Sequence, residues 1–175
     1  MNKIVTKSNY SKHIAEEFFR FHLIWRASSR FMYYVISVLC IAIAVVFLTL
    51  LFSPSLASIF LILGIGILII MPYQAKKIAK KIVDENPVSS AEYQVIIDEN
   101  HVVYKLDKSS KEYSWSDIKV VCKAANKLYF YVTKNIAIIV PLYTIEISEQ
   151  ANLLAFLKKQ KKYRKYPFKS KYEES

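Results

Sequence analysis

The stretches FMYYVISVLCIAIAVVFLTLLFS (residues 31–53) and LASIFLILGIGILIIMPY (residues 56–73) contain no charged residue and are separated only by Pro54 and Ser55. A helix needs about 20 mostly apolar residues to cross the hydrocarbon core of a bilayer. Two such helices joined by so short a turn fold back on one another, so both ends of the chain lie on one side. The sequence therefore predicts a transmembrane helical hairpin over residues 31–75.

Positive residues flank both predicted spans, whereas the turn between the spans carries no charge. The cations before the first span are Lys3, Lys7, Lys12, Arg20, Arg26 and Arg30, and those after the second are Lys76, Lys77, Lys80 and Lys81. Lysine and arginine are retained on the cytoplasmic side during insertion, so both termini are predicted to be cytoplasmic. A cleaved signal peptide is not expected, because the first apolar run begins only near Phe31 and a second span follows it directly.

Residues 1–30 form a predicted cytoplasmic arm that begins with a short strand-like stretch and continues as an amphipathic helix from Ser11 to about Ser28. The apolar stripe of this helix consists of Ile14, Phe18, Phe21 and Trp25, which recur at helical spacing. The stripe is suited either to the headgroup region of a membrane or to packing on the protein's own soluble part, and we favour the second interpretation.

After the spans, Pro72 is expected to kink or end the membrane helix. Residues 76–87 predict a separate basic helix with Lys76, Lys77, Lys80 and Lys81 on one side and Ile78, Ile82 and Val83 on the other. Asn86–Pro87 should end that helix, because a residue before proline is biased away from helical conformation.

From Ser89 onward the apolar period changes to two, which indicates β-strands. Six short strands are predicted, separated by turns at Glu99–Asn100, Lys108–Ser110, Ala125–Asn126 and Lys134–Asn135 among others. Ser148 is the expected N-cap of a final helix. The predicted inward-facing residues are Tyr93, Val95, Val102, Tyr104, Trp115, Leu128, Phe130 and Leu157.

The predicted fold class is a membrane α-helical hairpin plus a cytoplasmic α+β domain over residues 88–162. A curved antiparallel sheet capped by one C-terminal helix matches the outline of a pleckstrin-homology-like or GRAM-like barrel. Such barrels usually have seven strands, and Ile4–Thr6 is a candidate for the seventh. In that case the arm belongs to the same domain as the sheet.

The order of segments also resembles the YcxB-like membrane proteins of bacteria. The sheet contains the sequence Tyr113-Ser114-Trp115-Ser116-Asp117-Ile118, and Ile138-Ile139-Val140-Pro141 stands just ahead of the final helix. These motifs are similar to the pattern of that family. The resemblance implies an integral membrane protein of the bacterial plasma membrane with a cytoplasmic barrel-like domain. It supplies no activity and no catalytic residues.

The sequence contains no pattern typical of an enzyme or of a cofactor site. His13, His22 and His101 have no set of companions that would complete a zinc site, which needs three or four ligands. Gly64 and Gly66 are the only glycines and lie within the second span, so no glycine-rich loop is available to hold a phosphate. We interpret them as sites of close helix packing against Ala42 or Ala44. We expect no catalytic residue, no cofactor and no metal.

The net charge of +11 is concentrated near the C-terminus, where residues 163–175 form a predicted basic-aromatic tail. The cations of this region are Lys158, Lys159, Lys161, Lys162, Arg164, Lys165, Lys169 and Lys171. Together with the lysines after the second span, they are candidates for contact with anionic lipid headgroups. Nucleic acid is the competing polyanion and is less favoured, because the spans hold the tail at a membrane. A simpler interpretation is a solvated end.

The sequence thus favours a non-enzymatic membrane protein whose cytoplasmic domain acts by binding. We expect a protein partner, whose identity the sequence does not specify. The alternative is a membrane-embedded immunity protein against a secreted toxin or bacteriocin. Transport is poorly supported, because the spans contain no ionisable residue. Homo-oligomerisation of the hairpin stays open.

Overall fold

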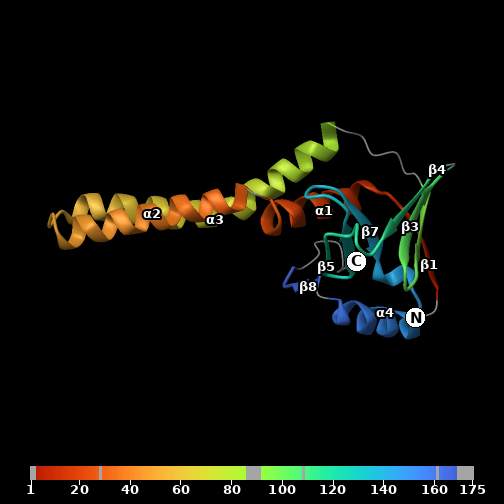
Figure 1. The fold of residues 1–175 in the computed structure, drawn as a ribbon. Helices are drawn as coiled ribbons and strands as arrows, with labels where there is room; N and C mark the ends of the chain where they lie inside the picture. Colours follow the sequence, from red (N-terminus) through yellow and green to blue (C-terminus); the bar gives the residue numbers. More distant parts are fainter. Residues whose placement is uncertain (1–2, 28, 86–91, 108, 161, 169–175) are drawn as a thin grey trace. The chain divides into compact units, whose positions relative to one another are not determined.

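The structure is a computed structural model that describes residues 3–27, 29–85, 92–107, 109–160 and 162–168 (Figure 1). The chain divides into two compact units. The sheet unit comprises residues 1–18 and 86–175, and the helical unit comprises residues 19–85. This division differs from the predicted one, since the start of the arm and the predicted tail both belong to the unit that holds the predicted domain 88–162.

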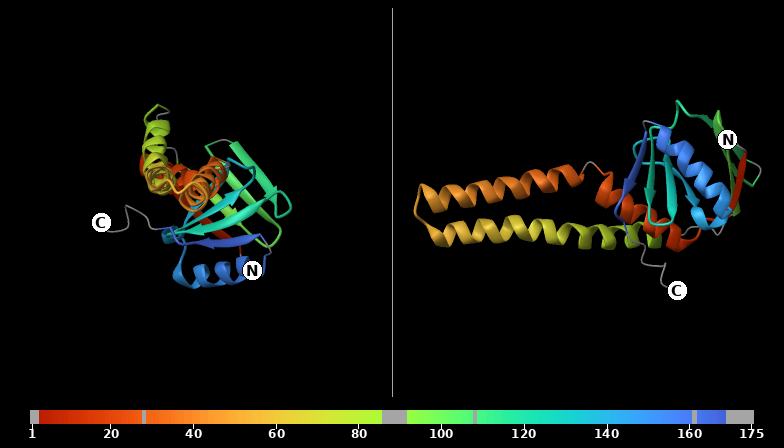
Figure 2. Two further views of the ribbon diagram at one scale, coloured as in Figure 1. Left: turned by 90° about the vertical axis from the view of Figure 1, so that its left-hand side faces the viewer. Right: turned by 90° about the horizontal axis from the view of Figure 1, so that it is seen from below.

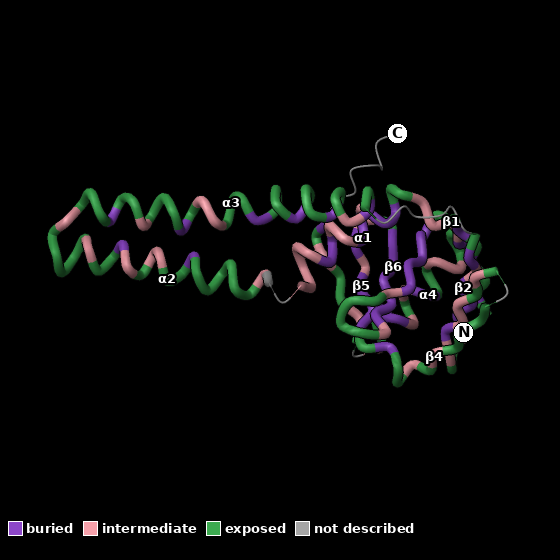
Figure 3. Tube along the Cα trace, turned by 90° about the horizontal axis from the view of Figure 1, so that it is seen from above, coloured by how far each residue is buried: buried purple, intermediate pink, exposed green. Residues whose placement is uncertain are grey.

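The helical unit consists mainly of α2 (Ser29–Thr49) and α3 (Pro54–Glu85). Both helices are long and apolar enough to cross a membrane, as the sequence predicted. Only 11% of the most apolar window of the first and 17% of that of the second is buried. Figure 3 shows most of both helices in the colour of exposed residues. Their apolar surface is therefore not that of a helix in the core of a soluble protein.

The turn between α2 and α3 is tight because its backbone adopts an unusual conformation. Phe52 has a φ of 48°, in the left-handed region. The Ser53 amide donates to the Phe47 carbonyl over 2.9 Å, which closes the end of α2. Pro54 then occupies the first position of α3, where a missing N–H costs nothing.

The two helices approach each other closely at Gly64. The Ser37 hydroxyl donates to the Gly64 carbonyl over 2.7 Å, and a Cβ at Gly64 would lie 2.9 Å from the Ile41 side chain. A Cβ at Gly66 would meet nothing within 4 Å. Close packing is thus confirmed for Gly64, but the predicted partners Ala42 and Ala44 are wrong. The contact lies nearer the start of α2, because the turn sets the pairing of the two helices.

The predicted separate helix over residues 76–87 is instead the continuation of α3, which runs through Pro72 without a break. Proline removes one backbone hydrogen bond, and the remaining bonds maintain the helix, which bends in its last turns (Figure 1). The helix ends at Glu85, directly before Asn86–Pro87, as predicted. The buried stripe of its basic turns is Ala75, Ala79 and Val83, whereas Ile78 is exposed, contrary to the prediction.

The sheet unit contains eight strands among the residues that the structure describes, arranged as two four-stranded sheets. The first sheet has the order β1-β2-β3-β4, and its strands are β1 (Ile4–Asn9), β2 (Glu92–Ile97), β3 (His101–Leu106) and β4 (Ser109–Ser114). The second has the order β7-β6-β5-β8, and its strands are β5 (Val120–Ala124), β6 (Lys127–Tyr131), β7 (Ala137–Pro141) and β8 (Tyr163–Tyr166). Neighbours are antiparallel except for the parallel pair β5–β8.

The expected contribution of the N-terminal strand is confirmed, because β1 pairs with β2 along its whole length. The predicted tail is wrong at its start, since Tyr163–Tyr166 is a strand rather than a free end. Charge dominates the sequence there, and pairing with a distant strand, β5, decides the local structure. The predicted turn at Lys108–Ser110 also shifts: Asp107, with a φ of 49°, begins it, and Ser109 already belongs to β4.

The core of the sheet unit takes side chains from both sheets and from α4 (Ile147–Lys159), which lies along one side of the sheets (Figure 2). Six of the eight predicted inward residues are buried: Tyr93, Val95, Val102, Leu128, Phe130 and Leu157. Tyr104 and Trp115 are only partly buried against this core. The predicted N-cap Ser148 is wrong, because the N-cap is Glu146, two residues earlier, and the helix begins at Ile147.

Strand β6 is buried on both faces, which its alternating sequence did not predict. Leu128 and Phe130 face the core, while Tyr129 and Tyr131 lie on the other face and contact Phe18 of α1 (Lys12–Trp25), with ring centroids 5.7 and 6.1 Å apart. The first half of α1 therefore packs on the protein's own sheet, as we favoured. Its N-terminus is confirmed near Ser11, whose hydroxyl accepts from the Ile14 amide, but it ends at Trp25, before the predicted Ser28.

The same face of β6 carries a buried ion pair between the Lys127 ammonium and the Glu17 carboxylate. Their side chains are only 8% and 3% exposed. A buried charge is tolerated only when it is paired, so the pair fixes α1 against β6 in one register.

We predict that Gly64→Val loosens the hairpin, because its side chain would overlap Ile41 and the Ser37 carbonyl. Overpacking of this kind costs about 1–3 kcal/mol. Gly66→Val is the matched control, since it places the same residue in open space of the same helix. SDS titration of the purified protein, followed by circular dichroism, should show earlier unfolding for Gly64→Val alone. Equal stability of the two variants would contradict the close approach.

We predict that Lys127→Met lowers the free energy of unfolding by about 3 kcal/mol, because it removes the ammonium group that pairs with the buried Glu17 carboxylate. The double variant Glu17→Gln/Lys127→Met removes both charges and should recover most of the loss. Chemical denaturation followed by tryptophan fluorescence measures both. If the double variant is no more stable than Lys127→Met, the loss of stability in Lys127→Met does not come from an unbalanced buried charge.

Candidate functional site

The predicted lipid-contact cations do not form one group. Lys158 and Lys159 lie in the last turn of α4, and Arg164 and Lys165 lie on β8, all of them exposed. Lys76, Lys77, Lys80 and Lys81 are exposed on α3 in the helical unit, where Lys81 pairs with Glu85 over 3.6 Å. Lys161, Lys169 and Lys171 lie outside the described residues.

Within the sheet unit, strand pairing builds a basic cluster of Lys123, Lys158 and Lys165. Lys165 of β8 is the register partner of Lys123 on β5. Partial burial is the main cause that lowers the pKa of Lys123, and the charges of Lys165 and Lys158 lower it further. The positive potential at Lys123 is therefore not cancelled by acidic neighbours. An anion at this point would be attracted by all three ammonium groups.

Lys162 and Arg164 are not part of the basic cluster. The Lys162 ammonium donates to the carbonyls of Trp115 and Ser116, at 3.1 and 3.2 Å, and so ties the chain after α4 to the turn after β4. Arg164 pairs with Cys122 in register and therefore lies on the opposite face of the sheet from Lys165. The sequence did not indicate Lys123, because only the parallel β5–β8 pairing brings it to Lys165.

A second candidate site is a cavity of about 350 Å³ between the edge strands β4 and β7. Four tyrosines from different elements line it: Tyr10, Tyr93, Tyr104 and Tyr113. The remaining lining residues are Leu106, Ser109, Lys111, Val132, Ile136, Ala137, Ile138 and Ile139. The cavity is therefore aromatic and aliphatic, with several hydroxyls and a single ammonium group. We call it the tyrosine cavity.

The tyrosines of this cavity are held by one another and by the backbone. The Tyr93 and Tyr104 rings lie 5.6 Å apart, and Tyr10 meets Tyr93 edge-on at 6.4 Å. The Tyr93 hydroxyl donates to the Ile139 carbonyl over 2.8 Å, which links the two sheets. Burial raises the pKa values of Tyr93, Tyr10 and Tyr104, so these hydroxyls remain protonated at neutral pH.

The sequence did not predict the tyrosine cavity. Tyr93 and Tyr104 recur on the inward face of the period-two pattern, and we assigned both to a filled core. Tyr93 does belong to the core, but Tyr104 is only partly buried against it and lines the cavity. The signal in the sequence is the use of tyrosine, rather than an aliphatic residue, at three inward positions of adjacent strands.

The His101 side chain lies between two carboxylates. Its Nδ1 lies 2.8 Å from the Asp98 carboxylate and its Nε2 lies 2.9 Å from the Glu112 carboxylate. Backbone amides of His101 and Asn100 are the main cause that lowers the pKa of Asp98. The arrangement joins the β2–β3 turn to β4. Within the described ranges, no group of three or more histidine, cysteine or acidic side chains could hold a metal ion.

Comparison with protein-family models, curated proteins and solved structures finds no match to this chain.

Proposed function

We propose that this protein is a non-enzymatic integral membrane protein of the YcxB-like type, with a pleckstrin-homology-like binding domain on the cytoplasmic side of the bacterial plasma membrane. The observation that carries the proposal is the place of the apolar hairpin in the chain. It is inserted between β1 and β2, which are direct neighbours in one sheet. Because Asn9 pairs with Glu92, the chain leaves the sheet and returns to it at the same end of these two strands.

This insertion supports a two-span topology. A chain that leaves and re-enters one folded domain crosses a bilayer an even number of times. The exposed apolar side chains of α2 and α3 form a surface far larger than soluble proteins leave in water. The cations beside both ends of the hairpin support a cytoplasmic position of the sheet unit in this proposal.

The order of elements supports the pleckstrin-homology-like assignment. Strands β1 to β4 form one antiparallel sheet, β5 to β7 form a second, and α4 follows. Strand β8 is an addition to that outline. Domains of this outline act by binding, and the sheet unit offers two surfaces for it, the basic cluster and the tyrosine cavity.

We further propose that the basic cluster contacts anionic lipid headgroups. Each cation near such a surface contributes roughly 1 kcal/mol, and the attraction fades beyond about 8 Å at physiological salt. Lys123, Lys158 and Lys165 together make a contact of a few kcal/mol, which orients the domain without being its anchor. The spans are the anchor.

We predict that a membrane-impermeant maleimide added outside intact bacterial cells modifies Ser55→Cys in the α2–α3 turn and spares Asn152→Cys on α4. The background is the variant Cys40→Ala/Cys122→Ala, which removes the native thiols. After the cells are lysed, Asn152→Cys should react, which shows that its thiol is accessible. Labelling of Asn152→Cys in intact cells, or protection of Ser55→Cys, would refute the topology.

We predict that the sheet unit moves closer to anionic than to neutral bilayers. The full chain, labelled with a donor dye at Asn152→Cys, is placed in nanodiscs with acceptor-labelled lipid. Energy transfer should be higher with anionic lipid and should fall at about 1 M salt, where the Debye length is about 3 Å.

The variant Lys123→Gln/Lys158→Gln/Lys165→Gln should lose this difference between lipids. The control Lys3→Gln/Lys105→Gln/Lys134→Gln removes the same charge from exposed positions of the same unit and should retain it. An equal loss in both variants would show that net charge, rather than the basic cluster, is responsible.

A further inference from the structure

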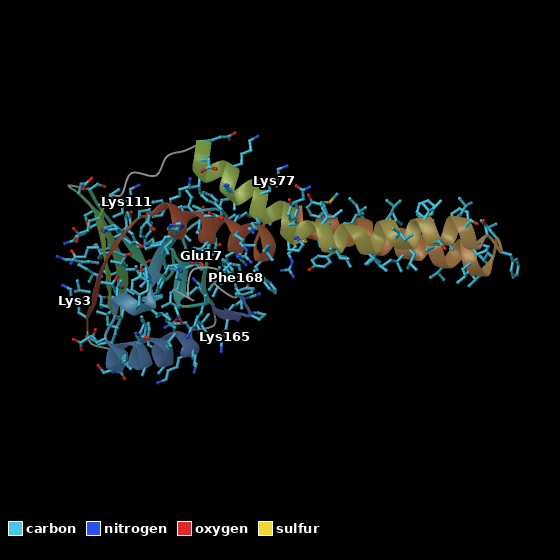
Figure 4. All side chains as sticks on the ribbon, turned by 180° about the vertical axis from the view of Figure 1, so that it is seen from behind. Lys3, Glu17, Lys77, Lys111, Lys165 and Phe168 are labelled. Atoms are coloured by element: carbon cyan, nitrogen blue, oxygen red, sulfur yellow. The ribbon has the colours of Figure 1, made fainter. Side chains whose placement is uncertain are left out.

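The tyrosine cavity has a charge pattern that selects its ligand. Among the described residues that line it, Lys111 of β4 is the one ionisable cation and none has an acidic side chain. Figure 4 shows Lys111 at one end of the sheet unit, far from Lys165 of the basic cluster. The two sites are therefore separate, and an occupant of the cavity need not be a membrane lipid.

Register explains why acidic side chains stay out of the cavity. Ser109, Lys111 and Tyr113 alternate along β4 and line the cavity, so Glu112 points to the other face. There the Glu112 carboxylate lies 2.9 Å from His101 Nε2. The nearest acid in the turn is Asp107, which raises the pKa of Tyr104 but is not a lining residue.

The cavity also offers hydrogen-bond donors beside its apolar walls. The Tyr93 hydroxyl donates its hydrogen bond to the Ile139 carbonyl. The hydroxyls of Tyr10, Tyr104 and Tyr113 make no hydrogen bond to another described residue. Ile136, Ile138 and Leu106 supply the apolar surface. A cavity of about 350 Å³ lies within the range of small-ligand sites, about 300–1,000 Å³.

We propose that the tyrosine cavity binds a small amphiphilic carboxylate, with its apolar body between the tyrosine rings and its carboxylate at the Lys111 ammonium. One cation matches one negative charge, and hydroxyl donors near the ammonium complete the coordination of the carboxylate oxygens. This inference deepens the proposed binding role of the sheet unit. It does not depend on the topology of the hairpin or on lipid contact by the basic cluster.

The test uses the full chain in detergent micelles and ligand-observed NMR, with protein-free micelles as the blank. The probes are 3-phenylpropionate and its neutral counterpart 3-phenylpropionamide, which have the same apolar body. We expect the carboxylate to bind about fivefold more tightly than the amide, the size of one partly exposed charge pair. Equal affinities, or no binding of either probe, would overturn the proposal.

Variants assign the binding to the cavity. Lys111→Met should reduce the affinity for 3-phenylpropionate to that for the amide. The matched control Lys105→Met removes an exposed lysine from the adjacent strand β3, outside the cavity lining, and should change it less than twofold. Ala137→Phe fills the cavity from β7 and should abolish binding of both probes. If Ala137→Phe does not fold, Ser109→Phe fills the cavity instead from the exposed strand β4 and should likewise abolish binding of both probes.

Equal effects of Lys111→Met and Lys105→Met would place the probe elsewhere and overturn the assignment. Failure of this inference and failure of the proposed function are distinguishable. Neither the maleimide labelling of Ser55→Cys nor the lipid-dependent energy transfer involves a residue of the tyrosine cavity.

Discussion

The antiparallel pairing of β1 with β2 is the constraint on which the rest of the structure depends. Ile4 pairs with Ile97 and Asn9 with Glu92, although the whole helical hairpin separates the two strands in the chain. The pairing completes the first sheet and places the entry to α1 beside the return of the chain. A hairpin built into a domain in this way is tied to it at both ends, and its two helices must run in opposite directions.

Covering of both sheet faces follows from the same insertion. Because α1 directly follows β1, its first half lies against β6, where Phe18 contacts two tyrosines and Glu17 pairs with Lys127. The other face of β6 belongs to the core that α4 completes. Strand β6 is thus buried on both faces, and its buried ammonium group, that of Lys127, is paired with Glu17. A buried pair of this kind adds little net stability once its desolvation is counted, whereas the loss of one partner is costly.

The two candidate sites use opposite physical devices. At the basic cluster, the β5–β8 pairing brings like charges together, and partial burial, with the charges of Lys165 and Lys158 added, lowers the pKa of Lys123. At the tyrosine cavity, residues of β2, β3, β4 and β7 line a mostly apolar space, with Lys111 as the one cation among the described lining residues. The first site suits a charged surface and the second a ligand that is mostly buried.

The sequence by itself determined the two apolar helices, the start of α1, the period-two strands and most of the core, because these depend on local hydrophobic pattern. Tertiary structure decided what local pattern does not contain. Pairing over long distances made Tyr163–Tyr166 a strand and brought Lys123 to the basic cluster. The hydrogen bonds on either side of Pro72 kept α3 continuous. Covering by α1 buried Tyr129 and Tyr131. The tyrosine cavity takes its lining from strands of both sheets, and no single strand carries that information.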